Sequence, residues 1–302
     1  MRKLSFILAM FLFITPLLFA CAGKKDDNSN GVIDLTEGFD EYYKARQLVC
    51  WQDIAAVYLA RKTLSDYEYA NALEVPKTLT EKAGFIISVS LLSRQKNDVS
   101  NYIIDDYIAE IKLSVEDGFE TLTVKEMALC FFALTAARTE YNYKNAAEHL
   151  ERSQNIDGGF PFSADYTYSD VESSAYALNI ITLSKRYITD NCLDNTLEYL
   201  AAAINDDNTL SDMENKKSSV ATALTLSSLI SANLPLTGEV STALTAAINS
   251  KFKESDGNRL IGYRRYIGDD KLKREVTGEV MLCFATTAYG NLWVSLFEEK
   301  NA

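Results

Sequence analysis

The chain has 302 residues, of which 47% are hydrophobic, and carries a formal net charge of −12 at pH 7. It is too apolar to be a disordered stalk, and we expect no nucleic-acid partner because an acidic surface repels phosphate backbones. With only 13 glycines and 4 prolines, the composition favours helices in one large domain or two small ones.

The chain begins with features of an export signal. Arg2 and Lys3 precede an apolar run over 4–20, which is at the short limit for spanning a bilayer and fits a signal peptide. The stretch Leu18-Phe-Ala-Cys21 resembles a lipobox, in which cleavage before the cysteine leaves its thiol to carry diacylglycerol. A plain signal peptide or a single-pass anchor is the alternative.

A lipobox divides the chain into three parts. It predicts a cleaved signal peptide over 1–20, lipidation of Cys21, a flexible tether over 21–35 and a folded domain over 36–302. We expect the protein to be lipid-anchored on the extracytoplasmic face of the cell membrane, or at the outer membrane of a two-membrane envelope. Loss of the signal leaves 28 basic and 42 acidic residues, a net charge of −14.

Recurrent helix starts reveal an internal repeat. Capping boxes read Thr78–Glu81, Thr123–Glu126 and Ser169–Glu172, and they lie 45 and 46 residues apart. In each box the hydroxyl can cap an amide at the helix start while the glutamate reaches back to the first residue. The next copy of the repeat follows 46 residues later, where Ala221–Leu224 matches Ala175–Leu178 in sequence. The sequence therefore predicts repeating helical units.

Two kinds of predicted helix alternate along the chain. One kind is apolar on most sides and belongs in the interior; the other, as in 142–153, 190–204 and 239–252, is amphipathic. Apolar helices repeated in such pairs can bury themselves by closing into a ring. The predicted inner helices are 51–62, 78–92, 123–137, 169–184, 218–232 and 275–289.

The links from outer helices to the next inner ones also repeat, with copies at 115–119, 154–160, 206–210 and 256–263, and all but the third contain glycine. The clearest copy is Gln154-Asn-Ile-Asp-Gly-Gly-Phe160, where we expect Gly159 to need a positive φ. Together with Ser169–Leu178, it resembles the repeat of the α/α-toroid superfamily, which includes protein prenyltransferases, terpenoid cyclases, complement thioester domains and cobalamin carriers. The resemblance covers about 51–298. It implies an all-α toroid of six inner and six outer helices around a cavity, but no single chemistry.

Several chemistries of that superfamily lack their residues here. The only histidine, His149, falls on an amphipathic outer helix, so we expect a surface residue and no prenyltransferase zinc site. The Asp-x-Asp-Asp motif of squalene-type cyclases and the Gly-Cys-Gly-Glu-Gln motif of thioester domains are absent. Serine or cysteine triads would need a histidine base. We therefore predict neither a metal site nor a cofactor.

Carboxylates at the starts of inner helices support an enzymatic alternative. In a ring they would face the mouth, where Glu172 and Glu126 could serve as general acid and base in a glycoside hydrolase or polysaccharide lyase. The competing interpretation is helix capping. The carboxylates are Asp53, Glu81, Glu126, Glu172 and Glu275.

Aromatic and basic residues concentrate in two loops that enter inner helices, at 160–168 and 263–266. Such side chains beside a cavity suit a ligand with an apolar body and polar edges, although they could equally pack the turns. We expect a non-catalytic lipoprotein that binds a small molecule, a glycan or a protein. The predicted ligand-binding residues are Tyr166, Tyr168, Asp170, Tyr263, Arg265 and Tyr266.

Four cysteines remain besides Cys21. An exported protein could pair them, but Cys130 and Cys283 sit within apolar helical stretches. We predict that these two are buried free thiols, and the sequence leaves the state of Cys50 and Cys192 open.

Overall fold

The computed structural model describes residues 39–44, 46–60, 63–117, 121–184, 189–232 and 238–301. They belong to a compact unit that runs from Leu35 to Ala302. The predicted signal peptide, the lipidation site Cys21 and the predicted tether lie outside the described residues and stay predictions.

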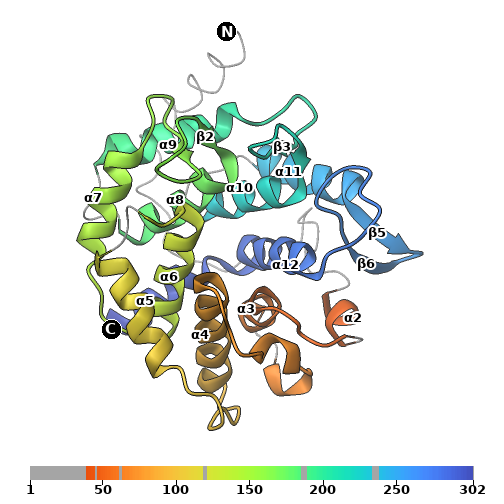
Figure 1. Cartoon of the computed structure of the whole chain (residues 1–302). Helices are drawn as coiled ribbons and strands as arrows, with labels where there is room; N and C mark the ends of the chain where they lie inside the picture. Colours follow the sequence, from red (N-terminus) through yellow and green to blue (C-terminus); the bar gives the residue numbers. More distant parts are fainter. Residues whose placement is uncertain are drawn as a thin grey trace, which may run out of the picture. The chain divides into compact units, whose positions relative to one another are not determined.

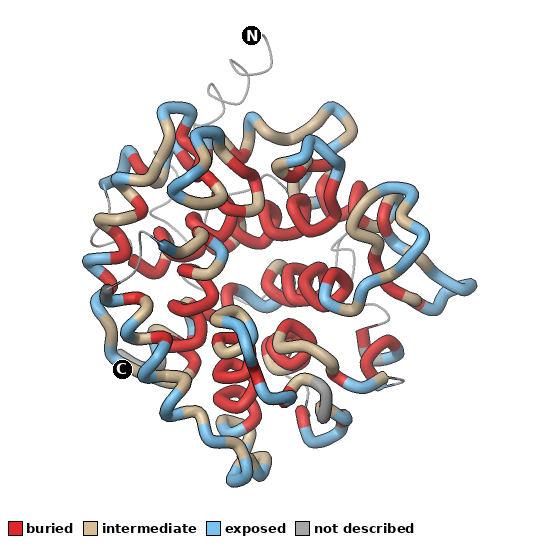
Figure 2. Tube along the Cα trace, in the orientation of Figure 1, coloured by how far each residue is buried: buried red, intermediate tan, exposed pale blue. Residues whose placement is uncertain are grey.

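Six helices form a closed inner ring (Figure 1). Each packs against the next, and the last packs against the first. They are buried along most of their length (Figure 2), as expected for helices that are apolar all round. The all-α toroid is confirmed, and every predicted inner-helix end falls within three residues of the observed one. The inner helices are α3 (Trp51–Leu59), α4 (Leu79–Arg94), α6 (Val124–Ala136), α8 (Val171–Leu183), α10 (Ser219–Ser231) and α12 (Arg274–Tyr289).

An outer layer surrounds this ring. Helix α5 packs on α4 and α6, helices α7 and α9 pack on α8, and α11 packs on α10. The layer is less regular than predicted, because two 3-10 turns stand between α3 and α4, where Leu64 and Leu73 cover the ring. Apart from α13, the helices and 3-10 turns outside the ring are α2 (Phe39–Lys44), η1 (Leu64–Asp66), η2 (Ala70–Leu73), α5 (Asp105–Asp117), α7 (Tyr143–Ser153), α9 (Asp190–Ala202) and α11 (Gly238–Lys251).

Three antiparallel hairpins lead into inner helices. They precede α8, α10 and α12 respectively. Because the inner helices of a toroid run parallel, the three hairpins gather at one end of the ring, which we call the mouth. The strands are β1 (Phe160–Pro161) with β2 (Ser169–Asp170), β3 (Leu210–Ser211) with β4 (Lys217–Ser218), and β5 (Lys253–Asp256) with β6 (Arg259–Tyr263).

The glycine turn before β1 differs from the prediction in one respect. The residue with positive φ is Gly158, at +87°, and not Gly159. Gly159 is needed for space instead, since a Cβ there would lie 2.5 Å from the Cβ of Ser169. Both glycines are therefore required, for different reasons.

Two of the three predicted capping boxes are confirmed. Thr78 with Glu81, and Thr123 with Glu126, make both reciprocal hydrogen bonds. The third box is wrong: Asp170 caps α8 by accepting the Ser173 N–H at 2.8 Å. Ser169 is already paired with Pro161 in the hairpin. Glu172 is consequently free of the capping role.

The C-terminal helix α13 (Leu292–Asn301) closes the other end of the ring. It packs against α6 and α8. Trp293 stacks on Phe132 with ring centroids 4.3 Å apart, and Asn291, just before α13, donates to Asn179. Both partners lie in the second halves of their helices. We call α13 with Asn291 the floor.

No single helix among the described residues has the length and apolarity to cross a membrane. The pair α12 and α13 meets those criteria jointly, but it is bent by 60°. All four described cysteines are free. Cys130 and Cys283 are buried, as predicted; Cys192 is also buried, and Cys50 is half-buried. Burial raises the pKa of Cys130 to about 12.

Candidate functional site at the mouth

An ion pair between distant elements lies at the centre of the mouth. Glu172, in the first turn of α8, accepts a hydrogen bond from Nη2 of Arg265 at 2.6 Å. The two side chains are 14% and 27% exposed. Ser218, which caps α10, donates to the same Oε1 at 3.2 Å. The pair thus joins the entries to α8, α10 and α12.

Tyrosine and aspartate extend this network. Arg265 Nε lies 3.0 Å from the Tyr266 hydroxyl, which in turn donates to Asp212 Oδ2 at 2.6 Å. The backbone carbonyl of Arg265 accepts the Ser219 N–H at 2.9 Å. Arg265 is therefore held by both its main chain and its side chain. Such fixation makes the guanidinium a preorganised hydrogen-bond donor.

Two opposing effects set the protonation of Glu172. Burial raises the pKa of its carboxyl, and the positive charge of Arg265 opposes that rise. The carboxylate in turn raises the pKa of Arg265, which stays charged. Hydrogen bonds between an arginine and a carboxylate are charge-assisted and are among the stronger hydrogen bonds in proteins.

An aromatic row lies on the loop between β1 and β2. Tyr166 packs edge-on against both Phe162 and Tyr168, with ring centroids 5.5 Å apart in each case. Tyr168 is 50% exposed. The loop is fixed to the ring because the Val124 N–H donates to the Phe162 carbonyl at 3.2 Å. We call Phe162, Tyr166 and Tyr168 the aromatic row.

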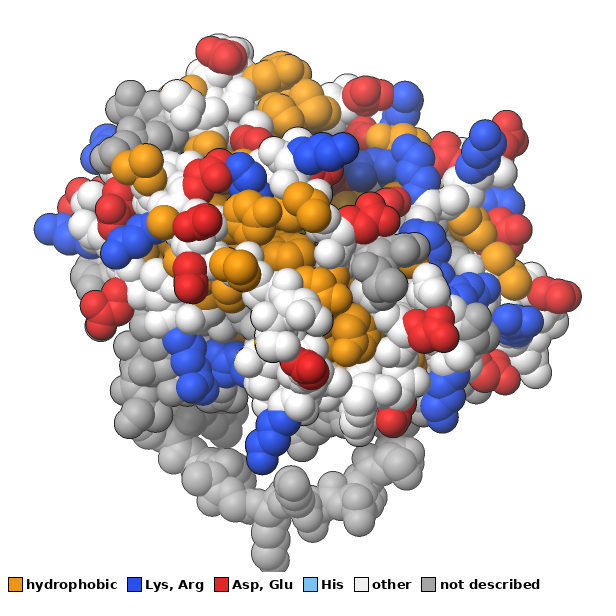
Figure 3. Space-filling view, turned by 60° about the horizontal axis from the view of Figure 1, so that its bottom comes forward, with side chains coloured by type: hydrophobic (Ala, Val, Ile, Leu, Met, Phe, Trp, Pro, Cys, Tyr) orange, Lys and Arg blue, Asp and Glu red, His pale blue; other side chains and the backbone are white. Residues whose placement is uncertain are grey.

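Figure 3 shows hydrophobic side chains gathered in the middle of one face, with acidic and basic side chains around them. Apolar surface with a charged rim is typical of a binding surface. Exposed large hydrophobic residues on loops of the mouth are Ile156, Tyr168 and Ile267.

The structure brings together some of the predicted ligand-binding residues and buries others. Arg265 and Tyr266 lie in the polar network, and Tyr166 and Tyr168 form the row. Asp170 is 4% exposed and occupied by capping, while Tyr263 is 3% exposed and donates to Asn249. These last two support the mouth without facing a ligand.

The predicted ring of acids does not form one site. Glu81 and Glu126 cap their helices. Asp53 is fully buried, where it accepts hydrogen bonds from Tyr43 and the Val49 N–H and pairs with Arg274. Glu172 is paired with Arg265, and Glu275 is exposed in the first turn of α12. Among the described residues, no three His, Cys, Asp or Glu side chains are placed to hold a metal ion.

The sequence did not reveal Ser218 and Asp212 as members of the network. Ser218 lies 46 residues after Glu172, which is one repeat length, so the repeat itself could have suggested that the two meet. Asp212 offered no such signal, because the β3–β4 turn alone brings it to Tyr266.

The interior of the ring has little free space. Side chains from α3, α6, α8, α10, α12 and the floor line a central cavity of about 30 Å³. That volume holds one or two water molecules, far less than the several hundred Å³ of a typical ligand pocket. The large central cavity that the resemblance implied is therefore filled, and α13 supplies part of the filling.

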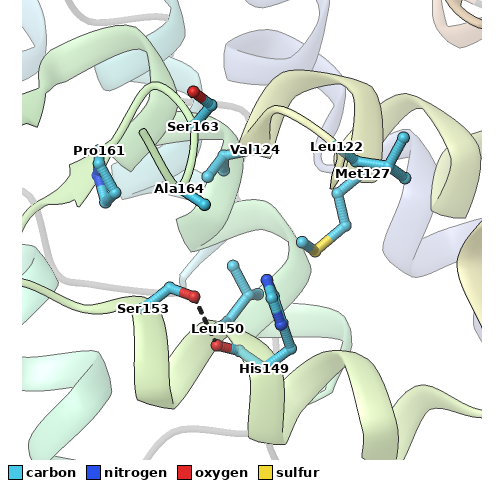
Figure 4. Close-up of a pocket in the computed structure, with 9 residues that line it drawn as sticks. All are labelled: Leu122, Val124, Met127, His149, Leu150, Ser153, Pro161, Ser163 and Ala164. Carbon is cyan, nitrogen blue, oxygen red and sulfur yellow. Dashed lines mark hydrogen bonds between the residues drawn. The ribbon is translucent and has the colours of Figure 1, made fainter. Parts of the chain in front are cut away.

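A second small hollow lies on the outside of the ring, between α6, α7 and the β1–β2 loop (Figure 4). It too holds about 30 Å³. The predicted surface residue His149 is half-buried and lines this hollow with Met127 and Leu150. Its size suits a few atoms at most.

Comparisons with known proteins bear on the fold alone. No protein-family model matches the sequence, and no curated protein matches it either. Among solved structures, the chain is similar to protein geranylgeranyltransferase-I from Candida albicans complexed with GGPP, with a TM-score of 0.55 and 12% identity over 74% of each chain.

It is also similar to an unsaturated glucuronyl hydrolase from Bacillus sp. GL1, an enzyme described as responsible for the degradation of glycosaminoglycan. The TM-score is 0.51, with 13% identity over 79% of this chain and 80% of that one. Both similarities place the chain among α/α toroids. At such low identity they assign no activity.

Proposed function

We propose that this protein is a lipid-anchored, exported binding protein whose toroid captures a neutral oligosaccharide at its mouth. The observation that carries the proposal is that the aromatic row and the fixed Arg265–Glu172 pair both lie at the entry to α8. Aromatic rings supply flat apolar faces, and the ion pair with Tyr266 supplies hydrogen-bonding groups at fixed positions. Sugars present the same combination of apolar ring faces and hydroxyl edges.

The free volume of the molecule supports binding at the mouth. With about 30 Å³ inside the ring, a sugar ring finds no room in the centre. The mouth offers exposed aromatic surface instead, at Tyr168. An extended ligand lying across the mouth would contact the row and the polar network together.

Net charge favours a neutral ligand over an acidic one. The chain without its predicted signal has a net charge of −14, which disfavours approach of a polyanion. This distinguishes the proposed ligand from the glycosaminoglycan named for the Bacillus hydrolase. A small molecule or a protein at the same surface would be the competing outcome.

The test is a binding screen with neutral and acidic oligosaccharides, followed by titration of the strongest hit. Tyr168→Ala and Arg265→Ala should each weaken binding by tenfold or more, which is about 1.4 kcal/mol. Tyr289→Ala, which removes an exposed tyrosine at the end of α12, is the matched control and should bind normally. Unchanged affinity in both mouth variants would refute the site.

One observation favours the enzymatic alternative. Burial raises the pKa of Glu172, and a raised carboxyl pKa is a property of general acids. A glycosidase needs a second carboxylate, and the predicted partner Glu126 is engaged in its capping box. Measurable hydrolysis of an oligosaccharide that Glu172→Gln abolishes would replace binding by catalysis.

The proposed anchor rests on the sequence. A diacylglycerol on Cys21 would hold the toroid within a tether's length of the lipid surface, where capture of extracellular glycan is useful. Metabolic labelling with a palmitate analogue should label the wild-type protein and not Cys21→Ser. Equal labelling of both would remove the anchor from the proposal.

A further inference from the structure

A buried carboxylate in the centre of the ring has no counter-charge among the residues that the structure describes. Glu279, in the middle of α12, is 5% exposed. Its carboxylate accepts hydrogen bonds from Gln52 Nε2 at 3.0 Å and from the Tyr176 hydroxyl at 3.2 Å. Both donors are neutral, and Glu279 forms no ion pair with any described residue. Lys125 lies over the Tyr176 ring, 5.7 Å from its centroid, without pairing with Glu279.

Such a group is energetically costly as it stands. An ionised carboxylate away from water normally requires a paired cation. Two oxygens offer about four acceptor positions, and Gln52 and Tyr176 use two of them. Glu279 therefore has free acceptor capacity for a cation, and no described residue supplies one.

The cavity next to Glu279 supplies the place. It is lined by four aromatic side chains together with Glu279 and polar groups of Asn179, Ser227 and Thr286. Aromatic faces attract cations, ammonium groups above all, and the attraction grows when the site is shielded from water. The aromatic side chains are Trp51, Phe132, Tyr176 and Trp293.

From this combination we infer that the central cavity binds a small cation of the ammonium class, either NH₄⁺ or a primary amine of methylammonium size. The N–H groups would donate to Glu279 and to the Asn179 side-chain oxygen, and the charge would face the aromatic rings. A volume of about 30 Å³ admits two atoms of water size. Larger ammonium ions are therefore excluded.

Ammonium differs from metal ions in carrying N–H donors and in its attraction to aromatic faces. Hard metal ions prefer oxygen ligands on all sides, whereas the cavity sets one carboxylate and the neutral polar groups of Asn179, Ser227, Thr286 and Asn291 beside four aromatic rings. Potassium and sodium chloride are therefore suitable reference salts at equal ionic strength. This site is distinct from the proposed glycan site at the mouth, and either can fail alone.

The chain carries its own reporter for the test. Its two tryptophans are Trp51 and Trp293, and both line the cavity. Tryptophan fluorescence of the purified chain should change saturably with ammonium chloride or methylammonium chloride. The change should be several-fold smaller with tetramethylammonium, potassium or sodium chloride. Thermal unfolding should shift upward with the same ion preference.

Glu279→Gln keeps the shape of the side chain and removes its charge, so the ammonium response should disappear. Glu198→Gln, the same change at an exposed position of α9, is the matched control and should respond as the wild type does. An identical response to all five salts in the wild type, or an ammonium response that persists in Glu279→Gln, would overturn the inference. The wild-type series decides the matter even if Glu279→Gln fails to fold.

Discussion

The two ends of the ring are built on different principles. The mouth repeats one device three times, a hairpin leading into an inner helix, and it leaves polar and aromatic side chains partly exposed. The floor is a single helix that occurs once, and its Trp293 stacks on Phe132 and packs against Trp51. The comparison leads us to expect that stability depends on the floor more than on the exposed side chains of the mouth.

The strongest test of this difference between the two ends is to remove the Trp293 side chain from the floor. Trp293→Ala should destabilise the protein by about 3–5 kcal/mol, because it deletes a buried ring stacked on Phe132. Urea unfolding measures the loss. Tyr289→Ala, at the exposed end of α12, should cost less than about 0.5 kcal/mol; similar losses in the two variants would contradict a floor that stabilises the ring.

The mouth does contain positions where stability is at stake, namely its turns. Gly158→Val should cost at least about 2 kcal/mol, because φ is +87° and a Cβ would lie 2.3 Å from the Asn195 carbonyl oxygen. Gly268→Ala is the control: φ is +88° but the surroundings are open, so we expect only the conformational cost of about 1 kcal/mol. Equal losses in thermal unfolding would show that crowding at Gly158 is unimportant.

The ion pair at the mouth should be intermediate in effect and dependent on pH. Arg265→Ala removes the charge that opposes the raised pKa of Glu172, and we expect a loss of about 1–2 kcal/mol at neutral pH, discounted for partial exposure. Below pH ~4 Glu172 is protonated in both the folded and the unfolded chain, so the loss should be small. It should grow as pH rises through the raised folded pKa. A loss independent of pH would mean that packing alone explains it.

The smallest effect on stability is expected in the aromatic row. Tyr168→Ala removes a half-exposed ring, so the free energy of unfolding should change by less than about 0.5 kcal/mol. The same variant is expected to lose ligand binding. A large loss of stability would instead assign the row to packing of the turn, the alternative interpretation of these tyrosines.

The ring could be predicted from sequence because its signals are local. Helices apolar on all sides and two genuine capping boxes mark most inner-helix boundaries, whereas the three hairpins were not predicted. The third box misled because Ser169 satisfies the sequence pattern but is held by strand pairing with Pro161. A competing backbone partner of this kind is invisible in a four-residue motif.

The interior could not be predicted, because it depends on residues far apart in the chain. Gln52, Tyr176 and Glu279 meet only after the ring has closed. The position of α13 across the ring likewise depends on tertiary packing and not on its own pattern. One signal was present: Glu279 is the carboxylate in the middle of an otherwise apolar segment, and that alone indicates a polar group inside the ring.

Closure of the ring has a consequence for how the chain folds. Helix α3 meets α12 through contacts such as Gln52–Glu279 and Asp53–Arg274, which span 227 and 221 residues. Contacts of such sequence separation carry the largest loop-closure entropy and form late. Helical pairs can assemble progressively along the chain, but the ring closes only when α12 reaches α3. Trp51 and Trp293, whose rings lie 6.1 Å apart, come together with that closure, so their fluorescence should report it.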